Sequence, residues 1–164
     1  MDKALYILAG YDDATEAHLS ALQNSLYERG FSGTHTRGLP QHITLGSFPT
    51  DREDEVISLL KRTADEISPF EVTFNHAGIF GGSKVLFIAP DTCPALLSLK
   101  ERFGSSYNWT PHTTMLIDEP DVIYRALPVV MEGFSAFSGR VTSLHLYEFF
   151  PTRYITTVYL KTES

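Results

Sequence analysis

The chain has 164 residues, of which 43% are apolar and 20% are charged, a balance typical of a soluble globular domain. No apolar stretch is long enough to cross a membrane, and the N-terminal segment lacks the long apolar region of a signal peptide. We therefore expect a cytoplasmic protein with no membrane partner. The formal net charge of −7 argues against a broad contact with a long nucleic acid. Cys93 is the single cysteine, which excludes an internal disulfide and a cysteine metal cluster.

The first half of the chain alternates between strand and helix patterns. Residues 3–9 are a compact apolar run that favours a buried strand. Leucines at helical spacing predict a helix over residues 13–29, and Gly30 is a typical stop signal for it. We expect a second strand at residues 41–48 and a second helix that begins at Thr50 or Asp51.

The second half begins with two strand patterns, at residues 70–74 and 84–89, with a turn at residues 81–83. A helix is expected from Asp91 or Thr92 through Phe103, followed by a strand at residues 112–117. The next helix, at residues 120–131, should be interrupted or shortened by Pro128. Two strands rich in β-branched and aromatic residues, at 138–149 and 154–162, end the chain with a turn at residues 151–153 between them.

This order predicts an α+β fold made of two similar lobes. Each lobe is expected to hold a small, mostly antiparallel sheet backed by helices. We expect all 164 residues to form a single domain, because the central strands would share one continuous core.

Two strings in the predicted strands carry the functional signal: His42-Ile43-Thr44-Leu45 and His112-Thr113-Thr114-Met115. Side chains alternate between faces along a strand, so the histidine and the threonine two residues later point the same way. A proline precedes each string, at a position where it interrupts no ladder. One such string is common by chance, whereas two copies in similar surroundings are not.

An imidazole titrates near pH ~6.5, so it can act as a base or an acid at neutral pH. A threonine hydroxyl can donate a hydrogen bond to a phosphoryl oxygen. His42 and His112 would then divide the acid and base roles, while Thr44 and Thr114 would support the charge of the transition state. The residues alone do not decide which histidine is the base.

On these two motifs the chain resembles the two-histidine phosphoesterase superfamily, which includes the 2′-5′ RNA ligase-like proteins and the cyclic nucleotide phosphodiesterases. The resemblance extends to Arg37, to residues 78–80 and 84–88, and to the closing strands at 144–160, so it covers nearly the whole chain. It implies a bilobal fold with one motif per lobe and a cleft between the lobes. It also implies chemistry that needs no metal and no cofactor.

Five further residues are candidates for substrate binding. Arg37 and Lys84 are candidates for phosphate contact, because the resemblance places their positions at the border of the cleft, although an exposed charge is the plain alternative. Trp109, three residues before His112, either stacks on a nucleobase or packs in the core. Phe48 is expected on the face of His42, and Tyr154 at the start of the last strand.

The remaining histidines have a structural interpretation that is more common than a functional one. His18 and His35 are expected at the surface, and His76 and His145 in structural hydrogen bonds. A zinc hydrolase is a weak alternative, because the chain has no His-Glu-x-x-His helix and no Cys/His cluster.

We therefore expect a monomeric phosphoesterase that acts on a 2′,3′-cyclic phosphate or a 2′-5′ linkage. Its partner would be a small nucleotide or an RNA end. Two alternatives stay open. The same histidines could catalyse RNA 2′-5′ ligation by exchanging roles, and a module that only binds phosphate esters would keep the threonines without needing two titrating imidazoles.

Overall fold

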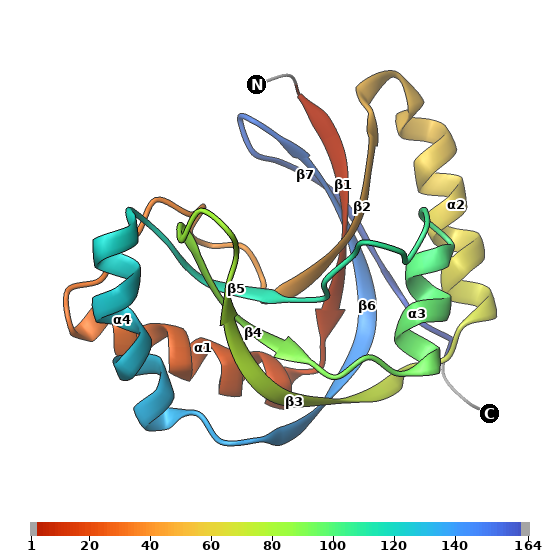
Figure 1. The fold of residues 1–164 in the computed structure, drawn as a ribbon. Coiled ribbons are helices and arrows are strands. Elements are labelled where there is room, and N and C mark those ends of the chain that lie inside the picture. Colours follow the sequence, from red (N-terminus) through yellow and green to blue (C-terminus); the bar gives the residue numbers. More distant parts are fainter. Residues whose placement is uncertain (1–2, 162–164) are drawn as a thin grey trace.

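The strands of this protein form one antiparallel sheet that opens like a V, with helices on its outer sides (Figure 1). The computed structural model describes residues 3–161. Its strands are β1 (Ala4–Tyr11), β2 (His42–Pro49), β3 (Phe70–Ile79), β4 (Val85–Pro90), β5 (Thr113–Ile117), β6 (Phe137–Phe149) and β7 (Arg153–Tyr159). Its helices are α1 (Asp13–Glu28), α2 (Glu53–Glu66), α3 (Pro94–Glu101) and α4 (Pro120–Gly133), with a 3₁₀ turn at Thr50–Arg52.

Strand β6 joins the two sides of the V. One edge of β6 pairs with β1 over residues 141–149. The other edge pairs first with β3, over residues 137–141, and then with β7, over residues 143–148. The sheet order is β2-β1-β6-β3-β4-β5, and every pairing is antiparallel. We call β2, β1, β7 and the second part of β6 the first arm, and β3, β4, β5 and the start of β6 the second arm. The α+β class is confirmed, and the two sheets expected for the lobes are continuous through β6.

The helices cover one face of each arm. Helix α2 contacts β6 and β7, and α3 contacts β2, so this pair backs the first arm. Helices α1 and α4 pack on each other and contact β5 and β4, respectively, which places them behind the second arm (Figure 1). Each motif strand therefore has a covered face and a face that the helices leave free.

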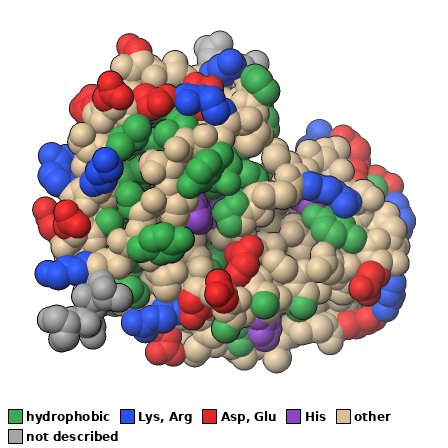
Figure 2. All heavy atoms as spheres, turned by 180° about the vertical axis from the view of Figure 1, so that it is seen from behind, with side chains coloured by type: hydrophobic (Ala, Val, Ile, Leu, Met, Phe, Trp, Pro, Cys, Tyr) green, Lys and Arg blue, Asp and Glu red, His purple; other side chains and the backbone are tan. Residues whose placement is uncertain are grey.

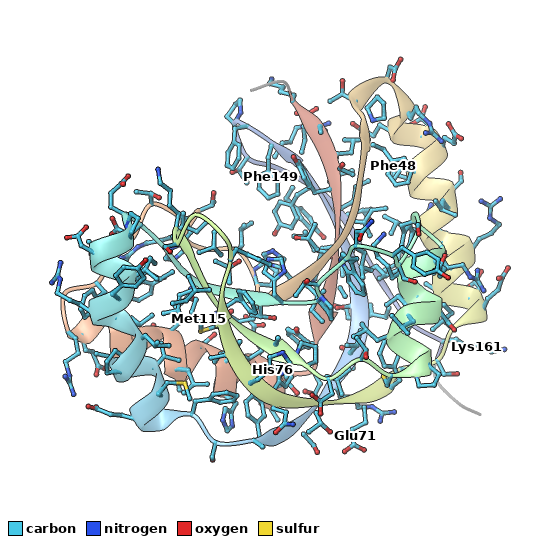
Figure 3. All side chains as sticks on the ribbon, viewed as in Figure 1. Phe48, Glu71, His76, Met115, Phe149 and Lys161 are labelled. Atoms are coloured by element: carbon cyan, nitrogen blue, oxygen red, sulfur yellow. The ribbon has the colours of Figure 1, made fainter. Side chains whose placement is uncertain are left out.

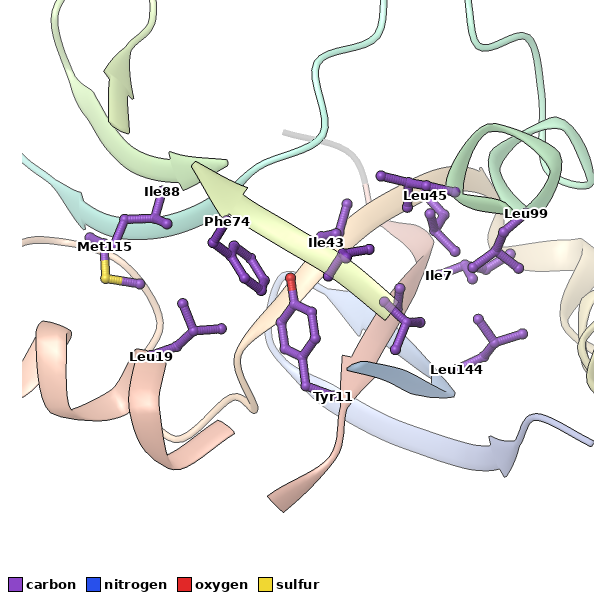
Figure 4. Packing of buried hydrophobic residues seen from close by; sticks show 14 of the residues in the cluster. Ile7, Tyr11, Leu19, Ile43, Leu45, Phe74, Ile88, Leu99, Met115 and Leu144 are labelled. Atoms are coloured by element: carbon purple, nitrogen blue, oxygen red, sulfur yellow. The ribbon is translucent and has the colours of Figure 1, made fainter. Parts of the chain in front are cut away.

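Burial of alternate residues fixes which way the motif side chains point. Ile43 and Leu45 are completely buried, while His42 and Thr44, which alternate with them, are half-buried on the opposite face of β2. Figure 4 shows Ile43 and Leu45 among the core residues. Truncating a buried leucine or isoleucine typically costs about 2–5 kcal/mol, so turning this strand over would be strongly unfavourable. The core thus holds the first motif in its orientation.

Helix α4 runs through Pro128 without a break, contrary to the expectation from the sequence. Pro128 has no N–H to donate to the carbonyl of Tyr124, but both residues are exposed, so water can bond that carbonyl. Ile123, Ala126 and Val130 are completely buried on the other side of the helix. Their packing outweighs the lost hydrogen bond.

The other elements match the sequence expectations within a few residues, with two further differences. Strand β3 continues to Ile79 past a register shift between Phe74 and His76, where exposed polar residues hide the alternation. Helix α3 begins only at Pro94, in the first turn, where a proline costs no hydrogen bond. No helix within residues 3–161 is long and apolar enough to span a membrane.

Candidate active site

The first motif presents the Nε2 atom of His42 to the free face of β2. The other ring nitrogen, Nδ1, lies 2.7 Å from the carbonyl oxygen of Pro40. A carbonyl can only accept, so Nδ1 carries the proton and Nε2 keeps a lone pair. Burial lowers the pKa of His42 to about 4, helped by the nearby charges of His145 and His112 and opposed by the Pro40 bond. His42 is therefore neutral at pH 7, the state that a general base requires.

The second motif repeats this arrangement on the opposite arm. His112 directly precedes β5, and its Nδ1 donates to the carbonyl oxygen of Thr110 at 2.9 Å. Its ring stands edge-on to Phe80, with 4.7 Å between the centroids, and tilted against Phe87 at 5.4 Å. Burial lowers the pKa of His112, and the bond to Thr110 opposes that shift. Both motif histidines thus carry the same tautomer, although only His112 is packed among aromatic rings.

Direct hydrogen bonds link the two motifs. The hydroxyl of Thr113, which is buried, donates to the carbonyl oxygen of His42 at 2.9 Å. Because that proton is used, the hydroxyl of Tyr11 must donate to Thr113 Oγ1, at 2.7 Å. Trp109 donates its ring N–H to the carbonyl oxygen of Thr44 at 3.2 Å. These bonds bring the two motifs together, and sequence reasoning assigned no role to Thr113 or Tyr11.

A cavity of about 170 Å³ opens beside the first imidazole and the second hydroxyl. His42 and Thr114 are both part of its wall, whereas His112 lies outside the wall but close enough for its charge to lower the pKa of His42. The rest of the wall comes from α1, both ends of β5 and the loop before β2: Gln23, His35, Thr36, Gly38, Leu39, Pro40, Gln41, Thr113 and Ile117. His35 is half-buried there, with its Nε2 2.6 Å from the Tyr27 hydroxyl, rather than exposed as the sequence led us to expect.

A third histidine lies on the same face of the first arm as His42. The register pairs His42 with Gly10 on β1, and Gly10 with Ser143 on β6. His145 follows two residues later on β6, so it points to the same side. The alternation of buried Leu144 and Leu146 with polar neighbours is a signal for this orientation, but the proximity to His42 depends on strand pairing that the sequence does not reveal.

Arg37 and Lys84, the two predicted phosphate-binding cations, lie at the surface. The guanidinium of Arg37 stacks on the ring of Tyr27, 4.0 Å from its centroid. The ammonium of Lys84 lies 3.6 Å from a carboxylate oxygen of Glu119, with both side chains well exposed. Neither cation is part of the cavity wall, so their contact with a substrate stays a prediction.

The expectation that Phe48 shares the face of His42 is wrong. An irregularity in the pairing of β1 with β2 leaves Leu45 without a partner, so Phe48 pairs with the core residue Leu5. Phe48 consequently packs against the core, and Figure 3 shows it on the α2 side of β2. Removing one residue from the alternation turns every later side chain of the strand to the other face.

Trp109 and Tyr154 have different surroundings. Trp109 is half-buried against the core, with the ammonium of Lys100 5.6 Å from its ring centroid. Tyr154 is 56% exposed and pairs with Tyr147, on the free face of the first arm. Figure 2, which views the molecule from behind, shows hydrophobic side chains gathered over this arm with a histidine among them. Stacking of a base on either ring stays a prediction.

Within the part of the chain that the structure describes, no three His, Cys, Asp or Glu side chains are grouped so that they could hold a metal ion.

Comparison with known proteins identifies the family. A model described as the 2′-5′ RNA ligase superfamily matches residues 11–149, which include both motifs. The crystal structure of E. coli LigT complexed with 3′-AMP is similar, with a TM-score of 0.66 and 18% identity over 98% of each chain. The crystal structure of TT0787 of Thermus thermophilus has a TM-score of 0.62 and 16% identity, over 98% of this chain and 100% of that one. No curated protein matches the chain. The resemblance drawn from the two motifs is confirmed: the chain belongs to the 2′-5′ RNA ligase superfamily.

Proposed function

We propose that this protein is a metal-independent phosphoesterase that cleaves a 2′,3′-cyclic phosphate or a 2′-5′ phosphodiester at an RNA end or in a small nucleotide. One observation carries the proposal. Two imidazoles from opposite arms each donate Nδ1–H to a backbone carbonyl, which leaves both Nε2 atoms free, and a hydrogen bond joins the two motifs that hold them. Membership in the 2′-5′ RNA ligase superfamily supports phosphoesterase-type chemistry on RNA ends.

The chemistry divides between the two imidazoles. For a cyclic phosphate, His42 Nε2 accepts the proton of a water molecule whose oxygen attacks phosphorus. The bond from phosphorus to one ribose oxygen breaks, and protonated His112 gives its proton to that oxygen, which leaves a phosphomonoester. Thr44 and Thr114 donate to non-bridging oxygens, where negative charge increases in the transition state.

The environments of the two rings support this assignment of roles. The pKa of His42 is lowered to about 4, so it resists protonation. The pKa of His112 is also lowered, but its ring is packed against aromatic faces rather than beside a third imidazole. A bound phosphate carries negative charge and raises the pKa of an adjacent imidazole, so substrate binding should favour the protonated form of His112. The pair titrates as a unit, and the roles reverse for ligation.

The free face of the first arm supports a nucleotide as the substrate. Tyr147 lies parallel to Phe149 at 5.7 Å and edge-on to Tyr154 at 5.4 Å. Figure 3 shows Phe149 on the inner side of the V, opposite to Phe48. Aromatic rings beside a phosphate site can stack on a nucleobase, which contributes about 1–3 kcal/mol. We propose that Tyr154, the most exposed of the three, makes this contact.

The test is turnover of 2′,3′-cyclic nucleotides and 2′-5′ dinucleotides, with products separated by the position of the remaining phosphate. His42→Asn and His112→Asn keep a donor for the Pro40 and Thr110 carbonyls but remove Nε2. Each should lower turnover by about 100-fold or more, while product binding changes by less than about tenfold. His76→Gln is the matched control, because His76 is exposed on β3 beside Asp91 and away from the cavity. Turnover retained in either motif variant would reject the two-histidine mechanism, whereas product binding without any turnover in the wild-type protein would favour a binding module.

A further inference from the structure

The imidazole of His145 is held by a chain of two hydroxyl groups, and neither of them belongs to the two motifs. Its Nδ1 lies 2.7 Å from Thr157 Oγ1, across the β6–β7 ladder. The hydroxyl of Tyr154 donates to the same Thr157 oxygen at 2.9 Å. The ring is half-buried, and its orientation is fixed at Nδ1, so Nε2 is the nitrogen left to face outward from the strand.

Gly10 leaves the space into which His145 Nε2 extends. A Cβ atom built on Gly10 would lie 2.4 Å from His145 Nε2 and 2.4 Å from Ser143 Oγ. Gly10 is the register partner of His42, so this space directly adjoins the first motif. The charge of His145 is among the causes that lower the pKa of His42, in agreement with this register. Because glycine has no side chain, Gly10 on β1 leaves room for His42 of β2 and His145 of β6 to face one space.

The hydrogen-bond chain allows His145 a tautomer opposite to that of the motif histidines. Thr157 accepts the proton of Tyr154, and it can donate its own proton to Nδ1 of His145. An imidazole that accepts at Nδ1 carries its proton on Nε2. His42 and His112 donate from Nδ1 and have lone pairs at Nε2, whereas His145 would carry an N–H donor at its own Nε2.

We propose that His145 contacts the bound phosphoryl group and donates its Nε2–H to a non-bridging oxygen, without taking up or releasing a proton in the reaction. Thr157 and Tyr154 are then positioning residues that fix the tautomer. Burial lowers the pKa of His145, so its ring is neutral at pH 7 in the free protein. The proposal rests on the proposed function and adds a third imidazole to it.

Two substitutions separate this role from a structural one. The side chain of glutamine can place an N–H near the position of Nε2, whereas that of asparagine reaches only the position of Nδ1. We expect His145→Asn to lower kcat by about 100-fold, as for the loss of one oxyanion donor, and His145→Gln to stay within about tenfold of wild type. Full activity of His145→Asn, or equal loss in both variants, would overturn the proposal.

A spectroscopic test needs no substitution. In ¹⁵N–¹H correlation spectra of the wild-type protein at pH 7, His145 should carry its proton on Nε2, and His42 and His112 on Nδ1. Thr157→Val should abolish the preference of His145 alone. A proton on Nδ1 of His145 in the wild-type protein would overturn the proposal. Turnover in His42→Asn and His112→Asn, measured in parallel, shows separately whether the proposed function itself fails.

Discussion

Protonation of His42 should make the protein lose stability as the solution becomes acidic. Its pKa falls from 6.5, the ordinary value, to about 4 in the folded chain. Below pH 6.5 the unfolded chain therefore binds more protons than the folded one, so stability is present at neutral pH and lost as the pH falls toward 4. The linkage relation gives a loss of about 2 kcal/mol between pH ~7 and pH ~4.5 from this residue.

The variant that isolates this contribution is His42→Asn. Asparagine retains a donor for the carbonyl of Pro40 but does not titrate, so the pH dependence contributed by residue 42 disappears. Urea unfolding at pH 7 and at pH 4.5 can be followed by the fluorescence of Trp109, the single tryptophan. Its ring N–H is bonded to Thr44, so the signal reports on the motif itself.

The measured quantity is the loss of unfolding free energy between pH 7 and pH 4.5, compared between wild type and His42→Asn. Wild type should lose about 2 kcal/mol more than His42→Asn on acidification, even if the variant is less stable at pH 7. His35, whose pKa burial also lowers, is not among the groups that act on His42, so it contributes equally to both proteins and cancels. The same loss in both proteins would show that His42 is not buried as a neutral ring, and the assignment of His42 as the base would fail.

Three other changes have defined outcomes. Thr113→Val leaves the partly buried carbonyl of His42 without its donor and should lower the free energy of unfolding by about 1–2 kcal/mol in thermal or urea denaturation; an unchanged stability would mean that this bond does not hold the motifs together. Gly10→Ala puts a methyl group 2.4 Å from His145 Nε2 and should abolish turnover, whereas Gly81→Ala meets open space and should leave both turnover and stability unchanged. Dialysis against a chelator should not alter turnover, and a loss restored by zinc would support a metal hydrolase.

The sequence predicted the direction of the motif side chains because that direction depends on local alternation. Ile43 and Leu45 are apolar and become buried, so His42 and Thr44 have to face the other way. The same argument applies to the second motif. No long-range information is needed, since strand geometry and burial act on neighbouring residues.

The sequence did not predict what depends on strand pairing. The irregularity at Leu45 turned Phe48 to the core side, and nothing in the residue pattern marks it. The proximity of His145 to His42 requires β1 to lie between β2 and β6, with Gly10 paired to both His42 and Ser143. Thr113 looked like a spacer within its motif, and its bond to the other motif emerges only when both strands are placed.

The convergence of both imidazoles on one phosphate is the claim on which this account depends, and titration with inorganic phosphate tests it most directly. At pH 7, the Nε2 resonances of His42 and His112 should shift together in ¹⁵N spectra and give the same dissociation constant. A shift of one ring without the other, or two different constants, would contradict a shared phosphate site.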